Sequence, residues 1–264
     1  MIKDLFHSGP FEYKMGLRKC KPEYFFRPHP NDDYLISLRT AIIATNKFRY
    51  CGLGSEGWDP FEEFNGLLRS WGTGYAKEPL DVAELGEAIA PDFMLIKDGA
   101  LVGGSVCFPS SWAFEEKFGK PIDVIHAPVP TLNDKFAPRI SAVLNKIPKG
   151  EGWARNNWGL SADDRLNHHP ALSGLQALNE SSDPARAFLR VENQVIAPLP
   201  KTKSSVFGIR VKTHPLPLVA EDNEARTGLI KSLETMSDEI AKYKNILNAK
   251  QSIINYLKGY KTTS

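Results

Sequence analysis

The sequence predicts an α+β fold in which helices pack on an antiparallel sheet of about five strands. Apolar residues recur at helical spacing in the first 90 residues, strand-like runs occupy the middle of the chain, and helical spacing returns near the C-terminus. Turns and irregular links join the strands, rather than regular crossover helices, which favours antiparallel pairing. We therefore expect one domain over residues 1–264, with a helical N-terminal extension (1–90) and a helical C-terminal tail (218–264).

The helices are expected mainly at the two ends of the chain. Residues 1–30 are rich in proline and aromatic residues and predict an irregular, ordered arm. Residues 31–43 begin with a helix-capping sequence and continue at helical spacing. Pro60 suits the first turn of a second helix, and residues 81–89 predict a third. An apolar stripe in residues 224–260 predicts one or two amphipathic helices.

The strand signals lie in the middle of the chain. Two apolar runs between residues 93 and 108 flank Asp98-Gly99, which predicts a β-hairpin. Three further strands are expected, at residues 154–160, 188–199 and 205–211. In the second of these, period-two alternation separates a polar face from an apolar one. The polar face carries Arg190, Glu192 and Gln194, and the apolar face carries Leu189, Val191 and Val195.

The segment between the hairpin and the next strand has mixed signals. Ser110 and Ser111 are expected to cap a short helix. Residues 122–125 predict a brief strand. Two prolines follow at alternate positions, so we expect His126 to lie on an extended segment or loop. Residues 132–146 predict another helix.

Charge and hydropathy exclude several classes of function. The chain has 33 basic and 31 acidic residues, a net charge of +2, and the basic residues are scattered. This balance argues against nucleic-acid binding. No apolar run reaches the roughly 18 residues that a membrane span needs. The N-terminal residues lack the layout of a signal peptide, so we expect a cytoplasmic protein without a membrane anchor.

Two motifs that could indicate a bound group are weak in this sequence. The three cysteines, Cys20, Cys51 and Cys107, are far apart and form no CxxC pair. They predict free thiols rather than a zinc or iron–sulfur site. Residues 52–57 match G-x-G-x-x-G, but no buried parallel strand precedes them, so a flexible loop is expected instead of a dinucleotide site.

Five motifs in order nevertheless resemble a known family. They are Phe108-Pro109-Ser110-Ser111-Trp112, Glu116-Lys117-Phe118-Gly119, Ile125-His126-Ala127-Pro128-Val129-Pro130, Arg155-Asn156-Asn157-Trp158, and Leu189-Arg190-Val191-Glu192-Asn193-Gln194. The ordered set resembles the alpha subunit of the heme-dependent oxidative N-demethylases, also called dimethylamine monooxygenase. The resemblance covers roughly residues 10–215. Asn193 and Ala197-Pro198 depart from the family pattern, which leaves the substrate open.

The resemblance implies a fold, a cofactor and partners. It implies a PAS-like antiparallel sheet that holds one heme b, with the iron ligated by a protein histidine and dioxygen bound opposite. It implies oxidation of a secondary amine, such as dimethylamine, to formaldehyde and a primary amine. Electrons would come from NAD(P)H through separate reductase subunits that carry flavin and iron–sulfur groups. A homo-oligomer is a further possibility that the C-terminal apolar stripe leaves open.

His126 is the expected iron ligand, because neutral imidazole binds heme iron well. His168 and His169 are rivals, although adjacent histidines in a polar loop are usually solvated. Arg155 is expected either to pair with a heme propionate or to donate to iron-bound oxygen. Its alternative reading is an arginine on the surface of a strand.

Glu192 is expected to hold a cationic amine or to take its proton, because oxidation needs the nitrogen lone pair free. An ion pair with Arg190 that only stabilises the sheet is the alternative reading, and Arg190 is also a candidate for cofactor binding. Trp158 is a candidate for stacking on the porphyrin, although core packing is the simpler role of a tryptophan.

Two other functions stay open at this stage. The chain could be a non-catalytic heme sensor, although its 264 residues carry no recognisable output domain. It could also oxidise a different nitrogen compound in a biosynthetic pathway. Release of formaldehyde from an amine would separate the enzyme from the sensor.

Overall fold

The computed structural model describes residues 2–6, 10–12, 16–73, 81–128 and 150–261. Within these residues, the chain forms one seven-stranded antiparallel sheet in the order β1-β5-β6-β7-β3-β4-β2. The strands are β1 (Arg18–Cys20), β2 (Cys51–Leu53), β3 (Asp92–Lys97), β4 (Ala100–Ser105), β5 (Gly152–Ser161), β6 (Phe188–Leu199) and β7 (Ser204–Pro215). The α+β class and the antiparallel pairing predicted from the sequence are confirmed.

The sheet has two strands more than expected, and both lie at its edges. β1 and β2 have three residues each, which is too short for an alternating pattern to be recognised. The predicted hairpin is confirmed as β3–β4. Asp98 and Gly99 adopt φ of 49° and 76° at its turn, as a two-residue hairpin loop requires.

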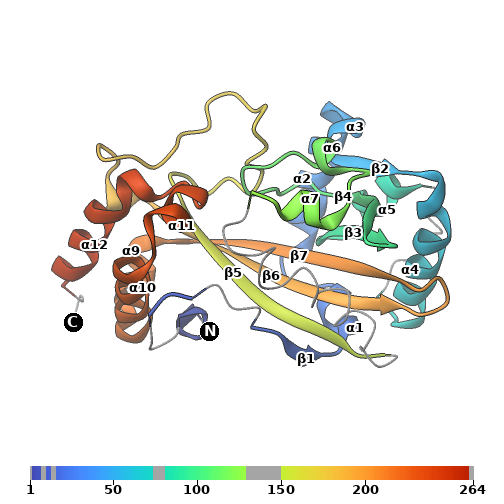
Figure 1. Ribbon diagram of the computed structural model, residues 1–264, viewed down its shortest axis with the longest axis horizontal. Helices are drawn as coiled ribbons and strands as arrows, with labels where there is room; N and C mark the ends of the chain where they lie inside the picture. Colours follow the sequence, from blue (N-terminus) through green and yellow to red (C-terminus); the bar gives the residue numbers. More distant parts are fainter. Residues whose placement is uncertain (1, 7–9, 13–15, 74–80, 129–149, 262–264) are drawn as a thin grey trace.

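The helices gather at opposite ends of the sheet (Figure 1). One end carries α2 (Asp32–Thr45), α3 (Lys47–Tyr50), α4 (Trp58–Ser70) and α5 (Val82–Ala88), with α1 (Pro22–Phe26) near β1. The other end carries α9 (Leu216–Glu221), α10 (Asn223–Thr235), α11 (Asp238–Tyr243) and α12 (Lys250–Gly259). Short 3-10 helices occur at η1 (Ile2–Leu5), η2 (Ser55–Gly57), η3 (Pro184–Arg186) and η4 (Leu247–Ala249).

Each group of helices packs against the sheet through its own apolar cluster. The N-terminal core cluster includes Ile43, Phe64, Leu68, Phe93, Leu95, Val195, Ala197 and Leu199. The C-terminal core cluster includes Trp158, Leu160, Leu189, Val191, Leu229, Leu233, Ile253 and Leu257. β6 contributes alternate residues to both clusters, so this one strand spans the two cores.

The short helices α6 (Phe114–Lys117) and α7 (Ile122–His126) lie over β3 and β4. A small cluster of Leu101, Val106 and Phe114 packs beneath them, with Met94 and Ile125 half-buried at its border. The candidate functional site is a cavity lined by α7 and by strands of the sheet.

Two local predictions were wrong. Residues 122–126 form a helix rather than a strand and loop, because Pro128 ends the helix before it instead of preventing it. Ser110 caps no helix, since α6 begins only at Phe114 and its N-cap is Ala113. Ser110 instead makes a backbone bridge to His168. The predicted helix at residues 132–146 lies outside the described part of the chain.

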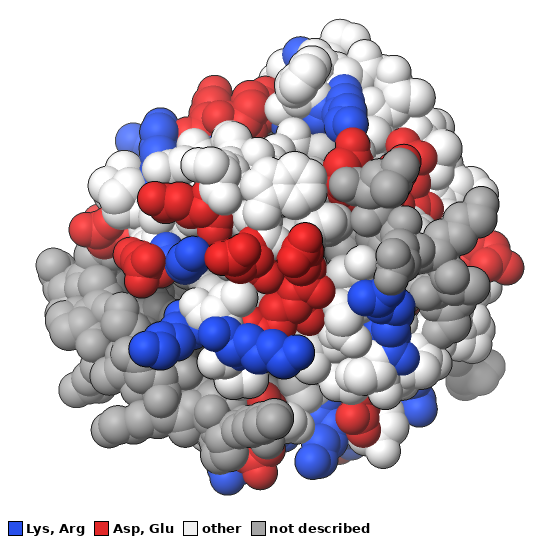
Figure 2. Space-filling view, turned by 90° about the vertical axis from the view of Figure 1, so that its right-hand side faces the viewer, with Lys and Arg blue, Asp and Glu red and all other residues white. Residues whose placement is uncertain are grey.

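Other predictions are confirmed. One of them is only partly so: residues 52–57 run from β2 through Gly54 into η2 instead of forming the expected flexible loop, while β2 is an antiparallel edge strand that pairs with β4, not the buried parallel strand that a dinucleotide motif follows. The cysteines are free thiols, with Cys51 and Cys107 buried. The face near α4 carries acidic and basic side chains side by side (Figure 2), in keeping with the balanced composition. Within the described residues, no helix combines the length and apolar character needed to cross a bilayer.

Candidate functional site

A cavity of about 570 Å³ lies against the face of the sheet that carries Arg190, Glu192 and Gln194 of β6. This volume falls within the roughly 300–1,000 Å³ of typical ligand pockets. Strands β3, β5, β6 and β7 contribute to its walls, and so do α7 and the end of α11. Apolar side chains such as Met94, Ile125 and Phe207 form part of the lining. All five residues expected at the site line this cavity: His126, Arg155, Trp158, Arg190 and Glu192.

His126 is the last residue of α7. Its Nδ1 is buried and has no hydrogen-bond partner within the described residues. Burial lowers the pKa of the imidazole to about 4, and the positive charges of Lys117 and Arg155 act in the same direction. The ring is therefore neutral at pH 7, which is the form that binds a metal.

The rival histidines meet carboxylates instead. His168 lines the cavity, and its Nε2 lies 3.0 Å from Oδ1 of Asp163. His169 is 2% exposed, and its Nε2 lies 3.0 Å from Oε2 of Glu115. Both rings thus have a polar partner, which distinguishes them from the unpartnered Nδ1 of His126.

Glu192 lies in the middle of β6 with both carboxylate oxygens engaged. Oε1 accepts a hydrogen bond from the hydroxyl of Ser110 at 2.5 Å. Oε2 accepts from Nε2 of Gln194 at 2.8 Å and from Nδ2 of Asn157 at 3.2 Å. All three donors are neutral, and among the described residues no direct ion pair cancels the negative charge of the carboxylate.

Arg190 is buried on the same strand, and its guanidinium holds backbone segments together. Its Nε donates to Oγ of Ser110 at 2.7 Å, and its terminal nitrogens donate to the carbonyl oxygens of Phe108, Arg165 and Leu166 at 2.9, 3.1 and 2.7 Å. Burial lowers the pKa of this guanidinium, although the nearby Glu192 opposes the effect. Within the described residues, Arg190 thus uses its hydrogen bonds to join β6 to the segments around Ser110 and Leu166.

Arg155 and Asn157 lie on β5, opposite Gln194 and Glu192 of β6. Lys244, which follows α11, reaches over this strand and donates to the carbonyl oxygen of Trp158 at 2.5 Å and to Oδ1 of Asn157 at 3.3 Å. Burial lowers the pKa of Lys244 to about 8, while the charge of Glu192 opposes the shift and that of Arg155 adds to it.

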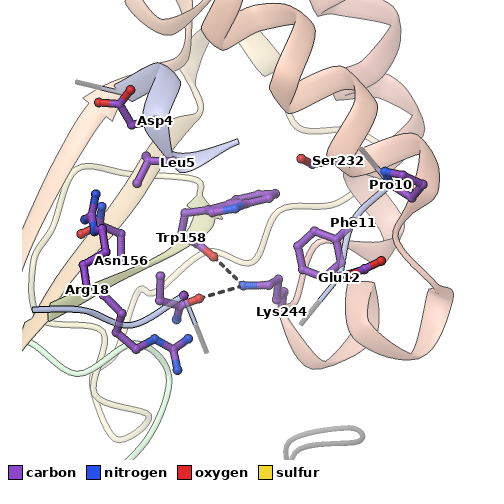
Figure 3. Close-up of a pocket in the computed structure, with 13 residues that line it drawn as sticks. Asp4, Leu5, Pro10, Phe11, Glu12, Arg18, Asn156, Trp158, Ser232 and Lys244 are labelled. Atoms are coloured by element: carbon purple, nitrogen blue, oxygen red, sulfur yellow. Dashed lines mark hydrogen bonds between the residues drawn. The ribbon is translucent and has the colours of Figure 1, made fainter. Parts of the chain in front are cut away.

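A second cavity of about 150 Å³ is lined by Trp158 and Lys244 together with N-terminal residues such as Leu5 and Phe11 (Figure 3). Arg155, Asn157, Trp158 and Lys244 line both cavities. The Trp158 side chain belongs to the C-terminal core cluster and is 7% exposed. Its ring meets that of Phe11 edge to face, at 6.1 Å between centroids.

Sequence reasoning missed three residues of the site. Ser110 was expected to cap a helix, Asn157 was noticed only as part of a motif, and Lys244 was not singled out. The family motif that begins at Phe108 contains Ser110 and could have drawn attention to it. No comparable local signal marks Lys244, because it lies in an ordinary amphipathic helical stretch.

The fold and site define an α+β protein with a large ligand cavity on one face of an antiparallel sheet. The walls offer a neutral imidazole, a carboxylate whose hydrogen-bond donors in the described part of the chain are neutral, and several cationic side chains. The sequence model of one protein family matches residues 64–254, and this range contains His126, Arg155, Trp158, Arg190 and Glu192. That family is described as "Haem-dependent oxidative N-demethylase, alpha subunit-like", and the chain belongs to it. The resemblance found in the sequence is confirmed.

Membership of this family identifies the chain, at the level of the family, as the alpha-like component of a heme-dependent oxidoreductase with more than one subunit.

Proposed function

We propose that the chain is a heme-binding oxygenase subunit that removes an N-methyl group from a secondary amine. One observation carries the proposal: His126, whose buried Nδ1 has no hydrogen-bond partner among the described residues, and the carboxylate of Glu192 line the same cavity of about 570 Å³. A neutral imidazole can bind iron, and a carboxylate can bind an ammonium group.

The residues present fit a heme b group in three respects. The cavity is large and has apolar walls, which suit a porphyrin. The neutral ring of His126 is available as an axial ligand. Arg155 is a cation on the cavity wall that suits a propionate. When bound, heme supplies the activation of dioxygen that no side chain can provide. We infer that the sheet is the PAS-like heme sheet which the resemblance implies.

Glu192 receives the substrate in this proposal. A dialkylamine is a cation at neutral pH, and a carboxylate held by three neutral donors keeps its charge for that cation. The amine must lose a proton before its lone pair is free, and the carboxylate of Glu192 takes that proton. Arg190 supports Glu192 through Ser110 instead of contacting the cofactor. Trp158 packs in the C-terminal core cluster beside the cavity.

The overall reaction balances with one reductant. One secondary amine, one dioxygen, two electrons and two protons give one primary amine, one formaldehyde and one water. The two electrons come from NAD(P)H through reductase subunits that carry flavin and iron–sulfur groups, which agrees with a chain that is an alpha subunit-like component. Dimethylamine is the first substrate to test.

The experiment measures heme binding and formaldehyde release. The purified chain, supplied with hemin, is expected to show a Soret band. His126→Ala is expected to weaken heme binding by at least the roughly 10–100-fold that loss of a supporting group costs a metal site. His168→Ala is the matched control, because that ring lines the same cavity but has a carboxylate partner.

An unchanged spectrum and heme affinity in His126→Ala would remove His126 as the ligand. Heme-loaded protein that receives electrons, consumes dioxygen and releases no formaldehyde from dimethylamine would contradict the demethylase. Reversible gas binding without turnover would instead identify a sensor.

A further inference from the structure

A serine stands between the two charged groups of β6 that face the cavity. Ser110 Oγ lies 2.7 Å from Nε of Arg190 and 2.5 Å from Oε1 of Glu192. We refer to Arg190, Ser110 and Glu192 as the cavity trio. Ser110 precedes Arg190 by 80 residues and Glu192 by 82, so the fold, and not the local sequence of β6, places it between them.

The direction of the hydrogen bonds follows from the chemistry of the groups. A guanidinium can only donate, so Ser110 accepts from Arg190. A hydroxyl has a single hydrogen, and the hydrogen of Ser110 is therefore directed to Glu192. The order Arg190, Ser110, Glu192 is thus a chain of two donated hydrogen bonds that ends on the carboxylate.

The backbone around Ser110 is held on both sides. The N–H of Ser111 donates to the carbonyl of His168 at 3.1 Å, and the N–H of His168 donates to the carbonyl of Pro109 at 3.1 Å. Arg190 donates to the carbonyl of Phe108 on one of these segments and to that of Leu166 on the other. The hydroxyl of Ser110 is therefore fixed in space before any ligand enters the cavity.

The position of Ser110 decides how Glu192 can be used. A direct contact between Arg190 and Glu192 would pair the two charges and occupy the carboxylate with a guanidinium. The intervening hydroxyl separates the charges and holds Oε1, while Asn157 and Gln194 hold Oε2. The carboxylate is oriented in this way without being neutralised by a direct ion pair.

We propose that Ser110 is a positioning residue that holds the Glu192 carboxylate in the orientation that binds a cationic amine in the cavity. This rests on the proposed function for the identity of the ligand. The ligand class is a protonated small amine, and Ser110 acts on it through Glu192 alone.

The test compares three variants of the heme-loaded chain. Ser110→Ala removes the hydroxyl, and Ser110→Thr restores it on a side chain that extended backbone accepts. Ser111→Ala is the matched control, because it deletes the neighbouring hydroxyl, for which no hydrogen bond is seen within the described residues. Binding of dimethylammonium chloride is measured by calorimetry, and demethylation kinetics are measured separately.

Ser110→Ala is expected to weaken dimethylammonium binding and raise KM by about tenfold or more, which is the size expected for one hydrogen bond to a charged group. Heme affinity is expected to stay unchanged, and kcat to fall less than KM rises. Ser110→Thr is expected within about threefold of the unmodified chain. Ser111→Ala is expected to match the unmodified chain.

Three outcomes would overturn the role of Ser110: equal binding in Ser110→Ala and Ser111→Ala, loss of heme together with amine binding in Ser110→Ala, or no rescue by Ser110→Thr. Failure of the proposed function has a different signature. An unmodified chain that binds dimethylammonium but releases no formaldehyde refutes the demethylase, and weaker binding in Ser110→Ala still supports the positioning role. An unmodified chain that does not bind the cation contradicts both.

Discussion

Buried arginines meet carboxylates in two different ways in this molecule. In the closed core, Arg39 contacts Asp92 directly, with side chains that are 0% and 1% exposed. At the cavity, Arg190 and Glu192 are separated by Ser110. We refer to Arg39 and Asp92 as the core pair, and compare it with the cavity trio.

The difference lies in what remains for a ligand. Asp92 accepts from Arg39 and from the backbone N–H groups of Cys107 and Phe108, at 2.7 and 3.0 Å for the latter two. Its charge joins α2, β3 and the segment that follows β4. Glu192 accepts only from neutral donors within the described residues, so its charge remains directed at the cavity. An arginine and a carboxylate therefore form a closed ion pair in one place, while in the other they leave a carboxylate facing the cavity, where we propose that it binds a ligand.

The largest expected effect on stability comes from a substitution that breaks the core pair. Asp92→Asn leaves the fully buried guanidinium of Arg39 without its counter-charge, and should lower the free energy of unfolding by about 3–5 kcal/mol. Urea denaturation of the heme-free chain measures it. Glu234→Gln is the control, because its pair with Lys258 is exposed and should be worth about 1 kcal/mol or less. Equal losses in the two variants would contradict the structural role of the core pair.

A smaller effect concerns Lys244 beside the cavity trio. Its pKa is about 8 in the fold, below the ordinary 10.5, because of burial. Between these two values the unfolded chain binds more protons, so raising the pH favours the folded state. The free energy of unfolding of the unmodified chain, relative to Lys244→Met, should rise by about 1–3 kcal/mol from pH 8 to 10.5. A difference that does not change with pH would mean that Lys244 titrates normally.

The smallest expected effect on stability comes from a substitution in the cavity trio, and it tests directly whether the trio differs from the core pair. Glu192→Gln keeps the volume and a hydrogen-bond acceptor, and it leaves Arg190 with its carbonyl partners. The free energy of unfolding should fall by about 1 kcal/mol or less. Amine binding should nevertheless be lost. A loss of stability as large as that of Asp92→Asn would place the cavity trio in the same class as the core pair.

The sequence predicted the parts of the fold that local patterns encode. Alternation along residues 188–199 separated Glu192 from Val191 and Val195, and the structure has these residues on the two faces of β6. The hairpin followed from Asp98-Gly99, whose positive φ values match the turn. These features depend on neighbours in the chain, so the chain alone indicates them.

Other features depend on contacts between distant residues. Ser110 pairs with partners 80 and 82 residues away, and Lys244 reaches Asn157 across 87 residues. The backbone at His126 was expected to be extended because prolines follow it. The structure has a short helix there, since a helix can end just before a proline. Local propensity carries no information about which distant side chain will complete a hydrogen bond.

The long hairpin of β6 and β7 fixes the face of the sheet on which Glu192 lies. The two strands pair without interruption from Phe188 and Pro215 to Leu199 and Ser204. Slippage by a single position would turn Glu192 toward packed hydrocarbon and expose valines to the cavity. The buried apolar residues of β6 in the two core clusters resist this slippage. Packing on one face of the strand therefore fixes the position of Glu192 on the other face.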